Sequence, residues 1–152
     1  NCVEMLRLSA KKHDVTMELH GVHRIICANR QMMDELVYNL CDNAIRYNNP
    51  GGRVDITVDA AVAFDKTAET GATIIEVKDT GIGISKEHQE RIFERFYRVD
   101  KSRSKSTGGT GLGLAIVKHI VAAHKNASLS LTSEPGKGTC IRVDFKMKTN
   151  LE

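Results

Sequence analysis

Hydrophobic and polar residues alternate with two different periods along this chain. Apolar residues three and four positions apart mark one face of a helix, and this pattern predicts helices over residues 1–12, 30–48, 87–96 and 111–124. Alternation with a period of two, or a short β-branched run, predicts strands over residues 15–19, 24–28, 53–62, 72–78, 128–133 and 139–146. Asn29 and Ser85 are the expected N-caps of the second and third helices.

The order of these elements predicts the fold class. Helices and strands do not alternate strictly, so the pattern does not indicate repeated βαβ units. We expect an α+β fold, a two-layer α/β sandwich in which a mixed, mostly antiparallel sheet is covered on one face by helices. Residues 64–71 are expected to form a hairpin loop and residues 134–138 a type II turn. Residues 98–109 are polar and without periodicity, which is typical of a mobile loop.

Length, charge and cysteine usage narrow the function classes. The chain has 152 residues, which suits one domain. We expect that domain over residues 1–150 of a longer protein, with residues 151–152 as a vector-derived tail. A net charge of +3 gives little support to nucleic-acid binding, and no apolar run approaches the roughly 20 residues of a membrane helix. The four cysteines form no C-x-x-C pair, which favours reduced thiols in a cytosolic protein over disulfides or a zinc site.

Three glycine clusters suggest close approach of the backbone to a ligand. They lie at residues 79–83 (DTGIG), 109–113 (GTGLG) and 136–139 (GKGT). Glycine lets backbone amides approach where a Cβ would obstruct, and the second cluster opens a predicted helix, whose amides favour a phosphate. Tight turns are the alternative for each cluster taken alone. The P-loop, dinucleotide-fold and protein-kinase patterns are absent.

A polar line runs along the predicted second helix. Asn39, Asn43 and Tyr47 are four residues apart, which places them on one face, with Arg46 beside them. Amides on a largely apolar helix need hydrogen-bond partners, which a loop or water can supply. The functional interpretation is that an amide oxygen ligates Mg²⁺, an ion that prefers hard oxygen ligands and usually keeps waters and phosphates.

These motifs together resemble those of a known family. Residues 39–47 (NLCDNAIRY), 79–83, 92–100 (IFERFYRVD) and 109–117 (GTGLGLAIV) are similar to the N, G1, F and G2 boxes of sensor histidine kinases, and residues 136–139 match a further glycine-rich turn. The boxes have the order and spacing of the ATP-binding catalytic domain, which belongs to the superfamily of gyrase B, Hsp90 and MutL. The resemblance implies a Bergerat-type fold with ATP and Mg²⁺ as ligands.

The resemblance also implies roles for residues that would contact the base and the metal. Asp79 is expected to accept a hydrogen bond from the adenine amino group, with Gly81 and Gly83 laying the backbone against the base. Thr139 is expected to bond near the adenine through water. Asn43 matches the Mg²⁺ ligand.

Further residues are expected around the phosphates and the nucleotide. Asn39 would lie near the phosphates, and Arg46, where the family commonly has Lys, would reach a phosphate oxygen. Tyr47 would stack or hydrogen-bond near the nucleotide, with packing on the sheet as the alternative. The remaining expected contacts come from the loop and the second glycine cluster: Arg98, Lys101, Gly109, Thr110, Gly111, Leu112 and Gly113.

No residue is expected to act as an acid or base. Asn39 stands where the ATP-hydrolysing relatives carry a Glu that activates water, and an amide does not take a proton at neutral pH. Glu35, one turn earlier, is the alternative base. None of the six histidines precedes an acidic residue on a long helix, so the phosphoacceptor is expected elsewhere.

The sequence therefore predicts the catalytic domain of a two-component sensor histidine kinase. Its expected partners are a histidine-bearing dimerisation domain of the same protein and, indirectly, a response regulator. We expect a monomeric fragment and a homodimeric, membrane-anchored parent with this domain in the cytoplasm. A serine kinase of the anti-sigma-factor type and a nucleotide-binding pseudokinase module are the alternatives.

Overall fold

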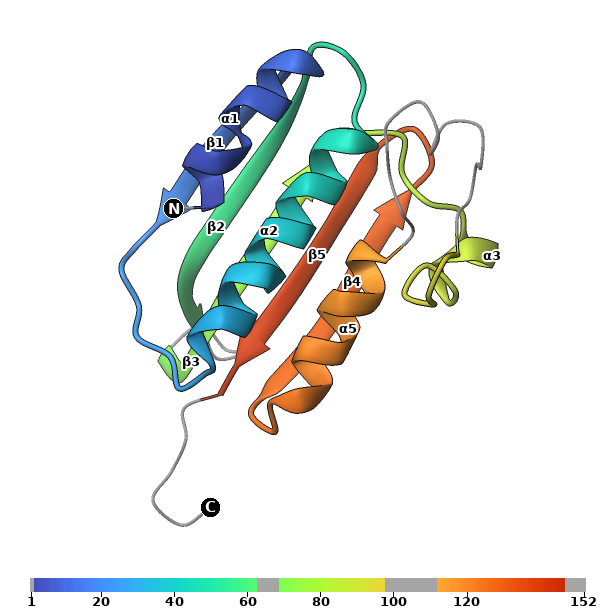
Figure 1. Cartoon of the computed structure of the whole chain (residues 1–152). Coiled ribbons are helices and arrows are strands. Elements are labelled where there is room, and N and C mark those ends of the chain that lie inside the picture. The colour runs from blue at the N-terminus through green and yellow to red at the C-terminus, as the bar shows by residue number, and fades with distance from the viewer. Residues whose placement is uncertain (1, 63–68, 98–111, 147–152) are drawn as a thin grey trace.

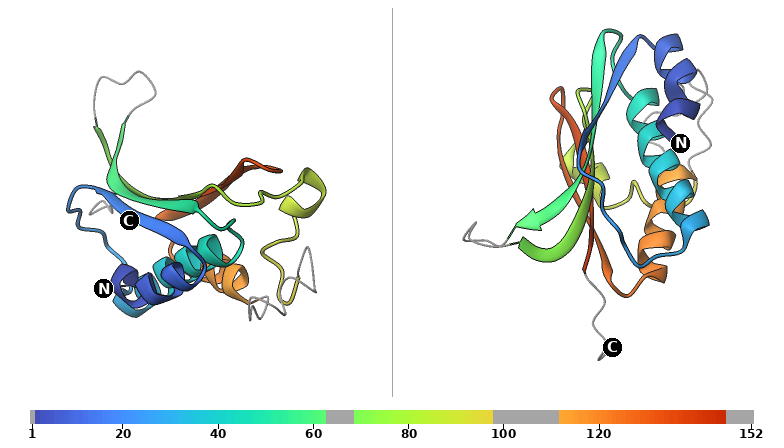
Figure 2. Two further views of the ribbon diagram at one scale, coloured as in Figure 1. Left: turned by 90° about the horizontal axis from the view of Figure 1, so that it is seen from above. Right: turned by 90° about the vertical axis from the view of Figure 1, so that its left-hand side faces the viewer.

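Helices α1 (Cys2–Lys12), α2 (Arg30–Arg46) and α5 (Gly113–Ala123) lie together on one face of a five-stranded sheet (Figure 1). The computed structural model describes residues 2–62, 69–97 and 112–146. A fourth, short helix, α3 (Lys86–Gln89), lies beside the sheet rather than over it. Seen edge-on, the molecule has two layers, and within the described residues no helix covers the second face of the sheet (Figure 2).

The sheet is mixed and mostly antiparallel, as expected. Its strands are β1 (Val15–Gly21), β2 (Gly52–Val62), β3 (Glu69–Asp79), β4 (Ala127–Glu134) and β5 (Gly138–Phe145). Their order is β1-β2-β3-β5-β4, with β1 parallel to β2 and every other pair antiparallel. Helix α2 makes the crossover between the two parallel strands. The predicted α+β sandwich is confirmed.

The hydrophobic core fills the space between the two layers. Leu36, Leu40 and Ile45 of α2 are fully buried in one cluster with Ile56 of β2 and Val143 of β5. Alternate residues of each strand point to the uncovered face of the sheet. Most of these residues are polar, so that face is largely polar. None of the helices in the described residues is long and apolar enough to cross a membrane.

The prediction of a strand over residues 24–28 is wrong, because this segment is a connection between the sheet and the helical layer. Strand β1 ends at Gly21, which has a φ of 103°. The Arg24 side chain then bonds to Thr73 Oγ1 (3.1 Å), while Asn126 donates to the Cys27 carbonyl (3.3 Å). These side-chain contacts replace strand pairing and leave Ile25 88% exposed.

The helix expected over residues 87–96 is also wrong after its first turn. Helix α3 ends at Gln89 and a series of turns follows. The chain reverses so that Tyr97 returns to α3, where its hydroxyl bonds His88 and its ring lies 4.6 Å from the Arg91 guanidinium carbon. This reversal places Phe96 at a φ of 63°. Ser85 holds the N-cap position without a side-chain cap bond.

The remaining elements agree with the sequence to within a few residues. Asn29 caps α2, because its side-chain oxygen accepts from the Met32 N–H at 3.0 Å. Helix α2 ends at Arg46 instead of residue 48, and the described part of α5 begins at Gly113 instead of residue 111. The expected mobile loop, and most of the expected hairpin loop, lie outside the described residues.

Candidate functional site

Asp79 is a buried carboxylate at the end of the central strand β3. Its exposed fraction is 7%, and its Oδ1 accepts backbone N–H groups from Gly81 (2.9 Å) and Thr139 (3.2 Å). Burial raises the pKa of Asp79 to about 6, although both hydrogen bonds oppose this rise. Among the described residues, no charged side chain contributes to the shift. Asp79 is therefore ionised at neutral pH with no cation of the described residues beside it, and it can accept a further hydrogen bond from a ligand.

The turn after Asp79 packs its backbone against two other segments. A Cβ at Gly81 would collide with the carbonyl oxygen of Tyr47, and one at Gly83 with that of Glu134. Gly83 also has a φ of 70°, a conformation that favours glycine. Glycine is thus required at both positions because neighbouring protein backbone leaves no room for a Cβ. This agrees with the interpretation of the cluster as a tight turn. Their contact with a base stays a prediction.

Hydrogen bonds join this turn to helix α2 and to the β4–β5 hairpin. The Ile82 N–H donates to the Tyr47 carbonyl (3.1 Å), and the Ile82 carbonyl accepts from Gly136 (2.8 Å). The Ile84 N–H donates to Ser133 Oγ (2.8 Å), which lies 2.8 Å from the hydroxyl of the buried Thr139. The turn is held from both sides, so the Asp79 carboxylate has a fixed position.

Sequence reasoning did not identify several residues that support this turn. Asn48 is buried, donates to the Arg53 carbonyl (3.0 Å) and accepts from the Asn49 N–H (2.8 Å). Thr80 Oγ1 accepts from the Arg53 N–H (2.9 Å), which ties the turn to β2. Gln89 donates to the carbonyls of Ile84 and Ser133 (2.8 and 3.2 Å). The period-two pattern of β4 does place Ser133 on the core side, which was the one available signal.

The two asparagines of α2 lie on one half-buried face, as predicted, but in different surroundings. Asn39 donates to the Glu35 carbonyl one turn earlier (2.8 Å), and a Cβ at Gly113 would lie 3.3 Å from its Oδ1. For the Asn43 side chain, no hydrogen bond is found among the described residues. Its amide oxygen is therefore available to a ligand, and an oxygen donor fits the preference of Mg²⁺.

Arg46 is engaged in an ion pair that the prediction did not include. Its Nε lies 2.8 Å from Asp42 Oδ2, and the two side chains are 26% and 20% exposed. The spacing of four residues on a helix made this pair predictable. The guanidinium retains other N–H donors for a phosphate, but Asp42 offsets its charge.

The N-terminus of α5 meets α2 at Asn39. Leu112 holds the N-cap position of α5 and provides no side-chain cap, and α5 has no acidic residue in its first turn. Free amides and the helix dipole favour an anion at such an end. The predicted contacts Arg98, Lys101, Gly109, Thr110 and Gly111 lie outside the described residues.

Helix α2 therefore contacts both the turn that holds Asp79 and the N-terminus of α5. The turn after Asp79 reaches α2 at Tyr47, and the N-terminus of α5 reaches it at Asn39. Eight residues of α-helix separate these points, about 12 Å along the axis. The arrangement suits an elongated ligand with a hydrogen-bond donor at one end and negative charge at the other.

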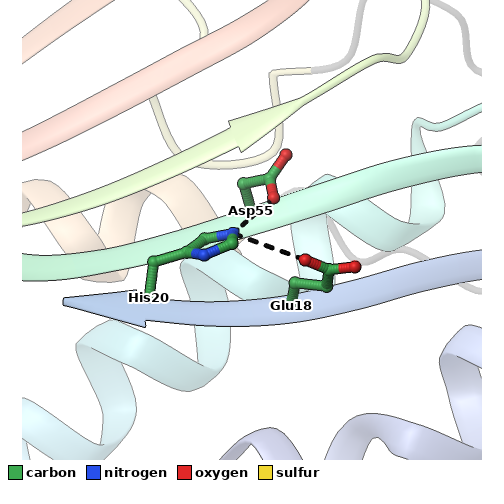
Figure 3. Close-up of side chains that lie close together, drawn as sticks. All are labelled: Glu18, His20 and Asp55. Atoms are coloured by element: carbon green, nitrogen blue, oxygen red, sulfur yellow. Dashed lines mark hydrogen bonds and ion pairs between the residues drawn. The ribbon is translucent and has the colours of Figure 1, made fainter.

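A second cluster of polar side chains lies on the uncovered face of the sheet. Glu18 and His20 of β1 and Asp55 of β2 point toward one another (Figure 3), with His20 Nε2 2.7 Å from Asp55 Oδ1. Arg53 also bonds Glu18 (2.6 Å) and Asp55 (2.8 Å), and with His20 it lowers the pKa of Asp55. The Arg53 guanidinium bonds both carboxylates and the His20 imidazole bonds one of them, so the cluster is an ion-pair network rather than a metal centre.

Comparison with known proteins identifies histidine kinases both by a family model and by individual relatives. Residues 28–149 match the sequence model of the family described as histidine kinase-, DNA gyrase B- and HSP90-like ATPase. The chain is 44% identical over 143 residues to the sensor histidine kinase RppB of Synechocystis sp., covering 93% of this chain and 30% of RppB. It is 52% identical over 103 residues to the sensor-like histidine kinase SenX3 of Mycolicibacterium smegmatis, covering 68% of this chain and 24% of SenX3.

A solved structure has the same architecture. The mycobacterial sensor histidine kinase MprB superposes with a TM-score of 0.75 at 26% identity, covering 95% of this chain and 88% of that one. The chain therefore spans less than a third of the length of the two curated relatives but most of the solved MprB chain.

Proposed function

Because this chain belongs to the family of histidine kinase-, DNA gyrase B- and HSP90-like ATPases, we propose that it binds ATP with Mg²⁺ as the catalytic domain of a sensor kinase. In that protein it donates the γ-phosphoryl group to a histidine of a separate dimerisation domain. The observation that carries the proposal is the buried carboxylate of Asp79, which is fixed by backbone hydrogen bonds and has no ion-pair partner among the described residues.

Asp79 supports recognition of adenine. The exocyclic amino group of adenine is a hydrogen-bond donor, whereas guanine presents an acceptor oxygen at the same ring position. An ionised carboxylate can only accept, so it favours adenine. Because Asp79 is nine-tenths buried, the bond forms away from competing water, and a charge-assisted bond there is stronger than a neutral one.

Helix α2 supports the assignment of the phosphate end. Asn43 offers an amide oxygen to Mg²⁺, and Asn39 lies beside the N-terminus of α5, where the amides favour a phosphate. Arg46 contributes less charge than a free arginine would, because Asp42 pairs with it. Bound Mg²⁺ neutralises charge on the transferred phosphoryl group.

The same helix supports transfer to an acceptor over hydrolysis. Asn39 occupies the position of the water-activating Glu and makes its own hydrogen bond to the helix backbone. Glu35, the alternative base, is exposed on α2. Without a base beside the γ-phosphate, ATP persists until an acceptor domain docks.

The proposal extends to the whole protein, of which relatives named as sensor histidine kinases are the support. Sensor histidine kinases are dimeric in this proposal, carry their acceptor histidine on the dimerisation domain and pass the phosphoryl group to a response regulator. We place this domain in the cytoplasm, with the parent anchored in the membrane. A serine kinase and a pseudokinase remain the competing functions.

Phosphotransfer to an added acceptor tests the proposal. The chain is mixed with a separately produced dimerisation domain and ATP labelled at the γ-phosphate. We expect acid-labile label on the acceptor, as phosphohistidine is acid-labile, and its loss with Asp79→Asn. Asp144→Asn, a matched charge loss on the uncovered face of the sheet, should retain transfer. Acid-stable label on a serine would favour the serine kinase, and ATP binding without transfer to any acceptor would favour the pseudokinase.

A further inference from the structure

A largely apolar pocket of about 500 Å³ lies between α5, β4 and the turns after α3. Its apolar lining comes from Phe93, Val121, Ala122, Ala127 and Leu129. None of its lining residues is among the predicted nucleotide contacts. The pocket is a separate feature of the surface, and it adjoins the strand at one edge of the sheet.

Strand β4 presents unpaired backbone groups along this edge. The Asn126 carbonyl accepts from Lys146 of the β5 side (2.8 Å), so the even-numbered residues of β4 bond to β5. The N–H and C=O groups of Leu129 and Leu131 therefore point outward. Among the described residues, no partner for these four groups is found. The strand contains neither Lys nor Pro, the residues that commonly prevent an exposed edge from pairing with another strand.

At both ends of β4, outward-pointing backbone groups already have hydrogen-bond partners within the protein. The Ala127 N–H donates to the His124 carbonyl (3.1 Å), and Gln89 donates to the Ser133 carbonyl (3.2 Å). The open part of the edge is thus short and lies between these two bonds. It is long enough to pair with the central residues of an added strand, about five in all.

The charged side chains that line the pocket are both lysines. Lys118 and Lys125 are exposed at its rim, and no ion pair of either is found among the described residues. His124 contributes no charge, because its Nδ1 donates to the Ile120 carbonyl (2.8 Å) and its Nε2 accepts from the Asn29 N–H (3.1 Å). With both nitrogens in these roles the ring is neutral.

We propose that this groove binds an extended acidic segment of a partner protein, which adds to the sheet as a strand beside β4. Its backbone pairs with Leu129 and Leu131, and a central apolar side chain enters the pocket. Acidic side chains two positions to either side lie on the same face of the added strand. They are about 13 Å apart along the added strand, on the side of the rim that carries Lys118 and Lys125.

Charge favours this occupant over a second copy of the chain. Pairing of two β4 strands would bring the lysines of both copies together. The stretch from Ala127 to Ser133 holds no acidic residue to offset them. An acidic segment supplies both the missing strand and the missing charge.

A synthetic peptide tests the proposal on the chain itself. The probe is an acetylated and amidated heptapeptide, Thr-Glu-Thr-Leu-Thr-Glu-Thr, followed by amide NMR and hydrogen exchange. We expect added protection at the outward amides of Leu129 and Leu131, but not at the inward amide of Ser130. The same peptide with alternate backbone nitrogens methylated on its pairing edge should bind at least tenfold more weakly. Equal binding of the methylated peptide would overturn strand addition.

Two matched pairs of substitutions test the charges. Lys118→Glu with Lys125→Glu should weaken peptide binding about tenfold or more, since each exposed ion pair contributes modestly. Lys11→Glu with Lys12→Glu makes the same change in net charge on α1 and should alter binding less than twofold. Equal effects of the two pairs, or peptide-induced protection at β1 instead of β4, would overturn the proposed site.

Discussion

The backbone N–H of Asn29 donates a hydrogen bond to Nε2 of His124 at 3.1 Å. Asn29 is the N-cap of α2 and His124 is the C-cap of α5, so the bond joins the ends of the two helices that form the candidate site. The second nitrogen of His124 bonds the Ile120 carbonyl, which sets the tautomer with the proton on Nδ1. The relative placement of α2 and α5 therefore depends partly on one neutral imidazole.

Replacing this histidine should loosen the helical layer. We expect His124→Ala to lower the free energy of unfolding by about 1 kcal/mol, because two hydrogen bonds are lost at a partly exposed position. Urea unfolding at neutral pH measures the change. His119→Ala, at an exposed position of the same helix, is the control and should change stability by less than half as much. Equal stability of the two variants would contradict a structural role for His124.

Asp79 is expected to reduce stability at neutral pH. Its folded-state pKa of about 6 exceeds the ordinary value of 3.8, so folding favours the protonated form. The associated stability is fully present below pH 3.8 and is lost as the pH rises to about 6. The loss amounts to roughly 3 kcal/mol at most. We expect Asp79→Asn to stabilise the fold at pH 7 but not at pH 4.

Unfolding of the Asp79→Asn variant and the unsubstituted chain across this pH range checks the sign. Asp144→Asn is the control, since that carboxylate pairs with Arg142 on the uncovered face of the sheet. A difference between Asp79→Asn and the unsubstituted chain that does not change between pH 4 and pH 7 would exclude a raised pKa for Asp79.

The same substitution should weaken ATP binding more than any other single change in the described site. Loss of one charge-assisted bond to the base corresponds to about 1.5–3 kcal/mol, or roughly ten- to a hundredfold in affinity. Calorimetric titration with ATP and GTP measures the effect, and the preference for ATP should fall as well. Unchanged affinity for ATP would exclude the adenine role.

Asn43→Ala is expected to remove the Mg²⁺-dependent part of ATP affinity without affecting the fold. The Asn43 amide makes no hydrogen bond to the described residues, so its loss leaves no partner unsatisfied. Titrations with ATP in Mg²⁺ and in a chelator separate the two parts. Gln31→Ala, an exposed amide on the same helix, should behave like the unsubstituted chain. A variant with the full Mg²⁺ dependence would show that Asn43 is not the ligand.

Asp42→Asn should increase ATP affinity a few-fold. The change releases Arg46 from its partner at 2.8 Å and removes a negative charge from the same helix face. Salt screens the attraction between the arginine and a solvent-exposed phosphate, so the effect should be larger at low salt. Combining Asp42→Asn with Arg46→Gln tests the cause, because the gain should disappear in the double variant. A gain that persists would indicate that Arg46 does not contact the phosphates.

Local patterns in the sequence determined most of the secondary structure and the composition of the candidate site. The cap at Asn29, the shared face of Asn39 and Asn43, and the position of Asp79 at the end of a buried strand all follow from spacings of a few residues. The ion pair of Asp42 with Arg46 is of the same kind, since it spans one helical turn. Such features depend on the helix or strand period alone, which the order of residue types specifies.

Only the tertiary structure decided how these pieces meet. The alternating residues 24–28 had the pattern of a strand, but Arg24 and Cys27 find their partners 49 and 99 residues away and the segment remains a connection. Likewise, Thr139 reaches Asp79 across 60 residues and Asn29 reaches His124 across 95. These bonds exist because β5 lies next to β3 and α5 lies next to α2 in space. A local period identifies the buried face of an element, but the element it packs against is set by the arrangement of the whole chain that buries all such faces together.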